Sequence, residues 1–381
     1  MNYSVFLIAV LGLLAALAPV VNNMFSPAVP ALASGIGVGA GAVQAGLSLA
    51  MIGLAVGQLA FGPLSDRLGR RGPLLVAMAM FVLSSAALLF VDSIAMLYSL
   101  RFVQGVGAAG AIVISRSMAA DSFTDHRLLK AIAVINIING LAPIVTPLAG
   151  GALVECIGWK GVFVGMLVIG LVMFMLCAPL RESLPPERRT RRGDLIWAPL
   201  RYVLGTRSYS TMLLHQALAL ALLFGNIAAS SSIVMGKYGL TAAACGTSLA
   251  VNGIFVAIGA FAAIRFRRPL TGIRVCCIGM VAMSVATGLM LVCDCGFYAY
   301  EAALCLMLGF MGITLTMSTT LALEAVRDHA GTGSALFGAA GFVVGAVVSP
   351  LVVTEVSTSA VFVVSAVLSA LFAALYPRQQ A

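Results

Sequence analysis

The sequence predicts an all-α membrane protein with twelve transmembrane helices, arranged as two six-helix bundles related by a pseudo-twofold axis. Hydrophobic residues make up 61% of the 381 positions and charged residues only 9%, whereas a soluble domain has roughly 25% charged residues. Residues 1–65 contain no Asp, Glu, Lys or Arg. So few charged side chains cannot cover the surface of a water-soluble fold, which excludes that class.

Charge-poor runs follow one another along the whole chain. Each is about 20 residues long, which is the length that a helix needs to cross the bilayer core. Lipid cannot satisfy a lone backbone amide, so a span is a helix or part of a closed barrel, and runs without strict alternation favour helices. We expect helices over residues 5–27, 41–64, 72–90, 94–117, 129–153, 160–180, 207–234, 242–264, 271–293, 297–322, 332–354 and 359–376.

Basic residues are concentrated in alternate connections between these helices. Eighteen of the 22 Lys and Arg residues lie in connections that share one side of the membrane with both termini. The positive-inside rule therefore predicts cytoplasmic N- and C-termini in a bacterial inner membrane. The net charge of +9 then reflects topology, so we expect anionic lipid headgroups and not nucleic acid as its counterpart.

One connection is longer than the others and contains Pro185-Pro186 and several Arg residues. We interpret residues 181–206 as a cytoplasmic linker between an N-terminal bundle, residues 1–180, and a C-terminal bundle, residues 207–381. Short repeats support this division, because Thr146-Pro147-Leu148 matches Ser349-Pro350-Leu351 about 200 residues further along.

The connection after the second predicted helix contains an Asp and three Arg at fixed spacing between glycines. Residues 62–71 read Gly-Pro-Leu-Ser-Asp-Arg-Leu-Gly-Arg-Arg and resemble the Gly-x-x-x-Asp-Arg-x-Gly-Arg-Arg signature of the major facilitator superfamily. The resemblance implies that the Asp pairs with arginines or a helix terminus and governs conformational switching; a merely basic loop is the alternative. The residues that we assign to switching are Gly62, Asp66, Arg67, Gly69, Arg70, Arg71, Arg116 and Asp121.

The fourth predicted helix carries Arg101, with Gln104 one turn later. This Arg-x-x-Gln-Gly sequence resembles a second motif of the same superfamily. A buried Arg on a spanning helix costs on the order of 3 kcal/mol and normally faces a cavity or a partner. The alternative is that the Arg101 side chain extends to the membrane surface.

The fifth predicted helix is rich in Gly and Pro. Residues 140–151 are similar to the Gly-x-x-x-Gly-Pro-x-x-Gly-Gly motif of drug:proton antiporters. They depart from it in one place, because Ala142-Pro143 stands in place of the Gly-Pro pair and at a shifted position. Small residues allow close helix packing and Pro bends a helix. We therefore predict a hinge, with plain packing as the alternative, formed by Gly140, Pro143, Pro147, Gly150 and Gly151.

Residues 16–30 resemble the first helix of the Bcr/CflA-like branch of drug exporters, with Asn23 where that branch commonly has an Asp. Gly331-Thr332-Gly333-Ser334-Ala335 is close to the Gly-Thr-Ala-Ser-Ala sequence of the same branch. The resemblance implies a monomeric exporter of small amphiphilic molecules that works by alternating access in exchange for protons, without cofactor or metal. An importer of the same fold and a non-transporting sensor are alternatives; the sequence contains no motif typical of an enzyme.

Proton coupling normally requires a titratable group inside the cavity, and all 13 acidic residues lie near predicted helix ends or in connections. We expect His215 or Glu301 to titrate, beside the cavity charge of Arg101. Without a buried acid, the site should accept neutral or anionic amphiphiles better than lipophilic cations. The remaining polar residues that we assign to the cavity are Asn22, Asn23, Tyr98, Gln104, Gln216 and Asn226.

Overall fold

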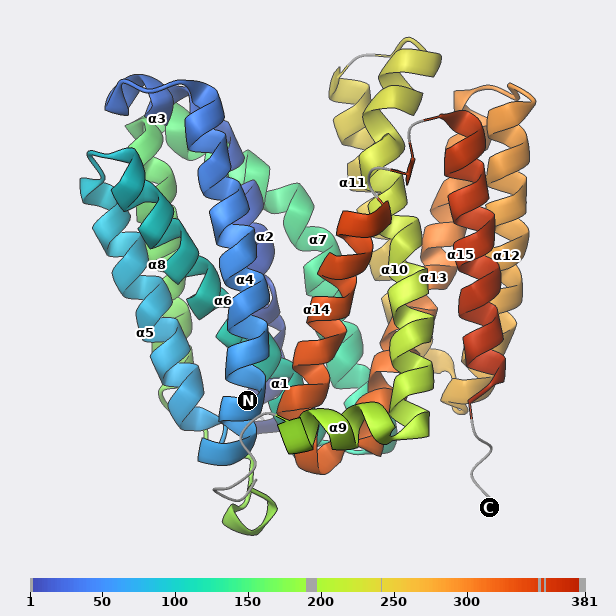
Figure 1. Ribbon diagram of the computed structural model, residues 1–381, viewed down its shortest axis with the longest axis horizontal. Helices are drawn as coiled ribbons and strands as arrows, with labels where there is room; N and C mark the ends of the chain where they lie inside the picture. The colour runs from blue at the N-terminus through green and yellow to red at the C-terminus, as the bar shows by residue number, and fades with distance from the viewer. Residues whose placement is uncertain (1–2, 190–196, 241, 349–350, 353, 377–381) are drawn as a thin grey trace. The chain divides into compact units, whose positions relative to one another are not determined.

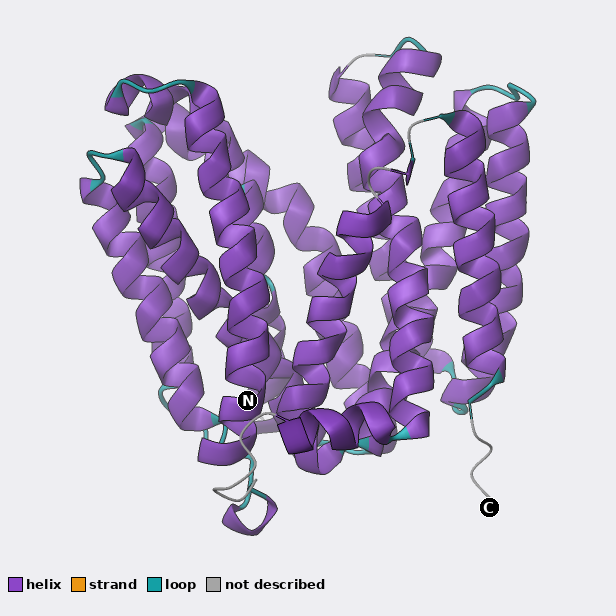
Figure 2. Ribbon diagram, in the orientation of Figure 1, coloured by secondary structure: helices purple, strands orange, loops and turns teal. Residues whose placement is uncertain are grey.

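The computed structural model describes residues 3–189, 197–240, 242–348, 351–352 and 354–376, and these residues form helices and loops without a strand (Figure 2). Ten helices in this part of the chain are long and apolar enough to cross a membrane, and an eleventh span is formed if the bent pair Asp125–Ala142 and Val145–Ile157 is counted as one. The remaining predicted span, over 332–354, corresponds to α14, Ala330–Val348. The predicted all-helical, multi-pass membrane fold is confirmed.

The chain divides into two compact units. Unit 1 comprises Met1–Ser122, Ala142–Leu200 and Asp328–Leu336. Its boundaries fall inside α7, Asp125–Ile157, and α9, Trp197–Gly205, as well as inside α14. The helices that lie wholly within unit 1 are α1 (Tyr3–Ala15), α2 (Leu17–Asn23), α3 (Val29–Ile36), α4 (Ala40–Leu68), α5 (Arg71–Ala87), α6 (Ile94–Ser122) and α8 (Trp159–Cys177) (Figure 1).

Unit 2 comprises Phe123–Leu141, Arg201–Arg327 and Phe337–Ala381. Its helix α10 continues into a short π-helix, Ser232–Lys237. In Figure 1, α12 and α15 lie side by side, and they pack against each other. The helices that lie wholly within unit 2 are α10 (Arg207–Ser231), α11 (Ala242–Ala262), α12 (Pro269–Val292), α13 (Phe297–Ala325) and α15 (Glu355–Ala374).

Glycines set the close packing in each unit. In unit 1, a Cβ atom at Gly105 of α6 would overlap the carbonyl oxygen of Ala50 on α4. In unit 2, a Cβ atom at Gly312 of α13 would overlap the carbonyl oxygen of Val256 on α11. The two contacts lie about 200 residues apart in the chain, as a duplicated six-helix bundle requires. Small residues at these crossings let the backbones approach closely.

The first predicted helix is broken. A single helix over 5–27 is expected from the apolar run, but α1 ends at Ala15 and α2 begins at Leu17. Pro19 explains the break, because it lacks the N–H that would bond to the Ala15 carbonyl and its ring clashes with that carbonyl. The helix α9 is a second difference, since it lies within the predicted linker 181–206.

We predict that Gly105→Ala destabilises the protein by about 1–3 kcal/mol, because the added methyl group meets the backbone of α4. The control is Gly246→Ala on α11, where nothing lies within 4 Å of the new Cβ and the better helix propensity of Ala should leave stability unchanged or slightly higher. Thermal unfolding of both variants in the same detergent measures the difference. Equal unfolding temperatures of the two variants would contradict the close contact between α6 and α4 at Gly105.

Candidate functional site

The turn between α4 and α5 consists of only two residues, Gly69 and Arg70. Gly69 has φ +92, a backbone conformation that side chains with a Cβ atom rarely adopt. The tight turn places the Arg70 backbone at the start of α5 while its side chain points back toward α4. The signature motif therefore fixes the direction of one arginine.

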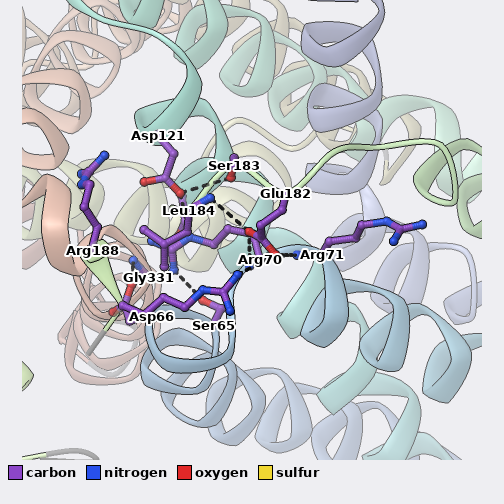
Figure 3. Close-up of polar contacts among 12 residues, drawn as sticks. Ser65, Asp66, Arg70, Arg71, Asp121, Glu182, Ser183, Leu184, Arg188 and Gly331 are labelled. Carbon is purple, nitrogen blue, oxygen red and sulfur yellow. Dashed lines mark hydrogen bonds and ion pairs between the residues drawn. The ribbon is translucent and has the colours of Figure 1, made fainter. Parts of the chain in front are cut away.

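Arg70 forms the centre of a buried charge network, which we call the Arg70 cluster and define as Ser65, Asp66, Arg70, Asp121 and Glu182 (Figure 3). Its Nη1 donates to Asp66 Oδ1 at 2.6 Å and to Ser65 Oγ at 2.9 Å, and its Nε donates to Asp121 Oδ2 at 2.8 Å. The Arg70, Asp66 and Asp121 side chains are fully buried. Burial opposes the charge of Arg70, but the two carboxylates outweigh it and raise its pKa.

The Asp66 carboxylate also holds the N-terminus of α14, with both of its oxygens. Asp66 Oδ1 accepts from Gly331 N at 2.8 Å, and Oδ2 accepts from Thr332 N at 2.7 Å and Thr332 Oγ1 at 2.6 Å. The first N–H groups of a helix have no partner within it and carry partial positive charge, so a carboxylate stabilises them. Gly62 makes the approach possible, because a Cβ atom there would lie 2.6 Å from the Cβ of Ala335.

Glu182 closes the cluster on its other side, from the segment after α8. Its carboxylate accepts from the backbone N–H groups of Arg70 at 2.7 Å, Leu184 at 3.0 Å and Arg71 at 3.3 Å. Burial acts to raise the pKa of Glu182, but these hydrogen bonds outweigh it, so the pKa lies below its usual value. Ser183 Oγ also donates to Asp121 at 3.2 Å (Figure 3).

Of the residues that we assign to switching, six meet around this turn. Arg71 joins through Nη2, which donates to the Ala178 carbonyl at 2.9 Å. Arg67 and Arg116 are half-buried and make none of the described contacts of Arg70. The sequence analysis expected a helix terminus as a possible partner of Asp66 but did not identify it as the α14 N-terminus, although the Gly-Thr-Gly sequence of residues 331–333 was noted as a motif. It missed Glu182 altogether.

A second buried arginine lies further along unit 1, in what we call the Arg101 cluster: Val21, Phe25, Ser85, Arg101 and Gln104. Arg101 donates from Nη1 to Gln104 Oε1 at 2.5 Å and from Nη2 to the Val21 carbonyl at 2.8 Å. Its guanidinium carbon lies 4.2 Å from the centre of the Phe25 ring, and Gln104 Nε2 donates to Ser85 Oγ at 2.8 Å. Among the described residues, Arg101 forms no ion pair.

The break in the first helix supplies the carbonyl that Arg101 uses. Because α2 ends at Asn23, the Val21 carbonyl is one of the last four of the helix and has no helical partner. The helix C-terminus also carries partial negative charge. Asn22 and Asn23 follow directly and are half-buried, and Tyr98 donates to the Ala42 carbonyl at 2.9 Å.

In unit 2, His215 is fully buried against α15. Its Nδ1 lies 2.9 Å from both the carbonyl oxygen and the Oγ of Ser369, and Ser369 Oγ donates to the His215 carbonyl at 3.0 Å. Gln216 Oε1 accepts from Ser318 and Thr319 at 3.1 and 2.8 Å. Asn226 is 2% exposed. His215 and Gln216 therefore join α10 to α15 and α13 respectively.

Glu301 lies at the centre of a polar group between α11 and α13, the Glu301 cluster: Ser248, Asn252, Glu301 and Cys305. Ser248 Oγ donates to Glu301 Oε1 at 2.8 Å, and Cys305 Sγ donates to Asn252 Oδ1 at 3.2 Å. Glu301 Oε2 and Asn252 Nδ2 are buried and have no hydrogen-bond partner among the described residues. A buried polar atom without a partner is costly, so this carboxylate is a site where a proton would be stabilising.

The predicted hinge residues all lie in α7, which is bent between Ala142 and Val145. Gly150 packs so closely that a Cβ atom there would overlap the Met24 carbonyl, whereas Gly151 faces open space. Gly140 approaches the Gly253 carbonyl, and Pro147 is half-buried. The side chain of Pro143 lies outside the described residues. Hinge motion at this bend stays a prediction.

We predict that Asp66→Asn lowers the free energy of unfolding by about 3 kcal/mol, because it leaves Arg70 with one buried carboxylate fewer and weakens the cap of α14. The matched control is Asp328→Asn, which removes the exposed 2.8 Å ion pair with Arg188 and should cost less than about 1 kcal/mol. Thermal or denaturant unfolding of the purified variants measures both. Similar losses for the two variants would show that the buried network contributes no more than a surface pair.

Comparison with known proteins gives a consistent result. The family model described as Major Facilitator Superfamily matches residues 11–347. An uncharacterized MFS-type transporter, YdgK, from Bacillus subtilis is 31% identical over 95% of this chain and 92% of its own length. A bicyclomycin resistance protein homolog from Haemophilus influenzae is 27% identical over 91% and 88%, and a chloramphenicol resistance protein from Pseudomonas aeruginosa is 28% identical over 62% and 56%.

Solved structures agree on the fold. The human organic anion transporter MFSD10 superposes with a TM-score of 0.75 over 99% of this chain and 100% of its own, at 17% identity. At this identity the likeness concerns the fold alone. The family match spans most of the chain, and the YdgK relative covers nearly all of it; on these grounds the chain belongs to the major facilitator superfamily of membrane transporters.

Proposed function

We propose that this transporter exports small amphiphilic molecules, including antibiotics, across the bacterial inner membrane by alternating access in exchange for protons. In this proposal it acts as a monomer with both termini in the cytoplasm. Two six-helix halves, residues 1–180 and 207–381, are joined by the linker 181–206. The names of the bicyclomycin and chloramphenicol resistance relatives support export of drugs.

The observation that carries the proposal is the buried Arg70 cluster on the N-terminus of α14. Removing one member of a buried charge network leaves another charge unpaired, which costs several kcal/mol. The network therefore favours two states, fully formed or fully separated and hydrated, over intermediate ones. Because α14 runs on from unit 1 into residues of unit 2, forming or breaking its cap at Asp66 is suited to switch a transporter between two conformations.

The Arg101 cluster supports the choice of substrate. Arg101 is a fully buried cation whose partners are a carbonyl, an amide and an aromatic ring. Among the described residues no carboxylate pairs with it, so a lipophilic cation nearby would be repelled in a medium of low dielectric constant. Neutral and anionic amphiphiles are the substrates that this arrangement favours.

The Glu301 cluster is better suited to proton coupling than His215. The His215 ring is fully buried, with Nδ1 in contact with Ser369 and Nε2 without a hydrogen-bond partner among the described residues, so a proton there would create a buried cation without an acceptor. Glu301 is half-buried and keeps one oxygen without a partner among the described residues. A carboxylate on a half-buried residue, with no paired cation among the described residues, can gain and lose a proton with changes in hydration.

We predict that proteoliposomes with an imposed pH gradient transport neutral phenicols and do not transport ethidium. Asp66→Asn and Arg101→Ala should each lower the initial rate about tenfold, equivalent to about 1.4 kcal/mol, while Asp328→Asn should keep the rate of the unsubstituted protein. The measurement is gradient-dependent flux of radiolabelled compound. Robust ethidium flux without phenicol flux would overturn the proposed specificity. No gradient-dependent flux of either compound class would overturn proton-driven export.

We predict that Glu301→Gln abolishes the dependence of transport on the pH gradient, because the amide cannot take up a proton. Substrate exchange in the absence of a gradient should persist, since it requires no net proton movement. His215→Ala should keep the gradient dependence. Loss of that dependence in His215→Ala, together with its survival in Glu301→Gln, would move the coupling role to the histidine.

A further inference from the structure

A groove of about 530 Å³ runs along the outer face of unit 2 between α12 and α15. Its walls are small and aliphatic side chains, among them Cys277, Ile278, Val281 and Ala370, and its one charged lining residue is Arg274. The groove-lining residues of α12 recur every three or four positions, first 274, then 277 and 278, then 281 and 282. They therefore form a single stripe along the helix. From Arg274 to Ala282 this stripe is about 12 Å long.

The groove opens onto apolar surface. Ile278 is 72% exposed, Val275 58% and Leu371 54%, and all three lie on the two helices that form the groove. In a transporter of this family such side chains face the acyl chains of the bilayer. The groove therefore has the shape and polarity to hold an extended hydrocarbon chain.

Arg274 is half-buried at one end of this apolar surface. It lies in the second turn of α12, which begins at Pro269. Its Nε is buried without a hydrogen-bond partner, and Nη2 lies 3.4 Å from the Ala374 carbonyl, beyond the usual range. Within the described part of the chain Arg274 forms no ion pair. A guanidinium with a buried, unpartnered nitrogen is stabilised by an anion or water beside it.

We propose that this groove binds an anionic phospholipid, with an acyl chain along α12 and α15 and the phosphate on Arg274. A guanidinium suits a phosphate because several N–H donors match its oxygens. Arg265, Arg267 and Arg268, in the segment just before α12, add positive charge at the same end of the helix. A free phosphate has no chain to fill the groove, and a zwitterionic lipid brings its own cation to the phosphate.

The proposal is tested by native mass spectrometry of delipidated, purified protein mixed with phosphatidylglycerol or phosphatidylcholine of matched acyl chains. One additional favourable charge is worth about fivefold in retention, so the unsubstituted protein should retain phosphatidylglycerol about fivefold better. Arg274→Gln should remove this preference, and the control Arg127→Gln, at an exposed position in the first turn of α7, should keep it. Ala370→Leu, which fills the groove and leaves the charge, should lower retention of both lipids.

Arg274→Lys keeps the charge and should keep most of the preference, so it serves where Arg274→Gln does not give monodisperse protein. Glycerophosphoglycerol, the headgroup without chains, should not compete with the lipid. An unchanged preference in Arg274→Gln, equal loss in Arg127→Gln, or full competition by glycerophosphoglycerol would each overturn the lipid site. The assay contains no substrate and no gradient, so its result is independent of the proposed transport activity.

Discussion

A guanidinium in a place without water must be surrounded by acceptors, and that constraint shapes unit 1. Arg70 is fully buried between α4 and α5, and its charge is tolerable only because Asp66 and Asp121 approach it to within 2.8 Å. Two carboxylates and one guanidinium give this group a net negative charge. The α14 N-terminus and the backbone of the segment around Glu182 take part in this balance, so one arginine organises four separate parts of the chain.

Arg101 meets the same constraint with different groups. Its charge is offset by the Val21 carbonyl, by Gln104 and by the face of Phe25, and the Val21 carbonyl is available because α2 ends at Asn23. The Asn23 that stands at the expected carboxylate position of the Bcr/CflA-like branch is therefore compatible with a stable Arg101. Dipoles and a ring offset the Arg101 charge only in part, which leaves its field for a substrate.

The sequence predicts most of the helices because apolar run length is a local property. The signature motif of residues 62–71 likewise predicts that Asp66 pairs with an arginine, because the two lie close together in the chain. It does not predict partners that are distant in the chain. Glu182 lies 112 residues from Arg70, and Gly331 lies 265 residues from Asp66, and no spacing rule connects them. The break near Pro19 was missed for another reason. The apolar run continues across it, and hydropathy does not depend on whether a residue has a backbone N–H.

The three arginines show how position selects the counter-group. At the tight turn, where α4, α6 and the segment after α8 meet, carboxylates from the protein surround Arg70. Within the span of α6, where a second buried charge would need its own solvation, Arg101 is offset by dipoles and a ring. On the outer face of α12, the described residues offer Arg274 one distant carbonyl. A cation there needs a partner from outside the chain, and in a bilayer the anion that arrives with a matching apolar chain is a phospholipid.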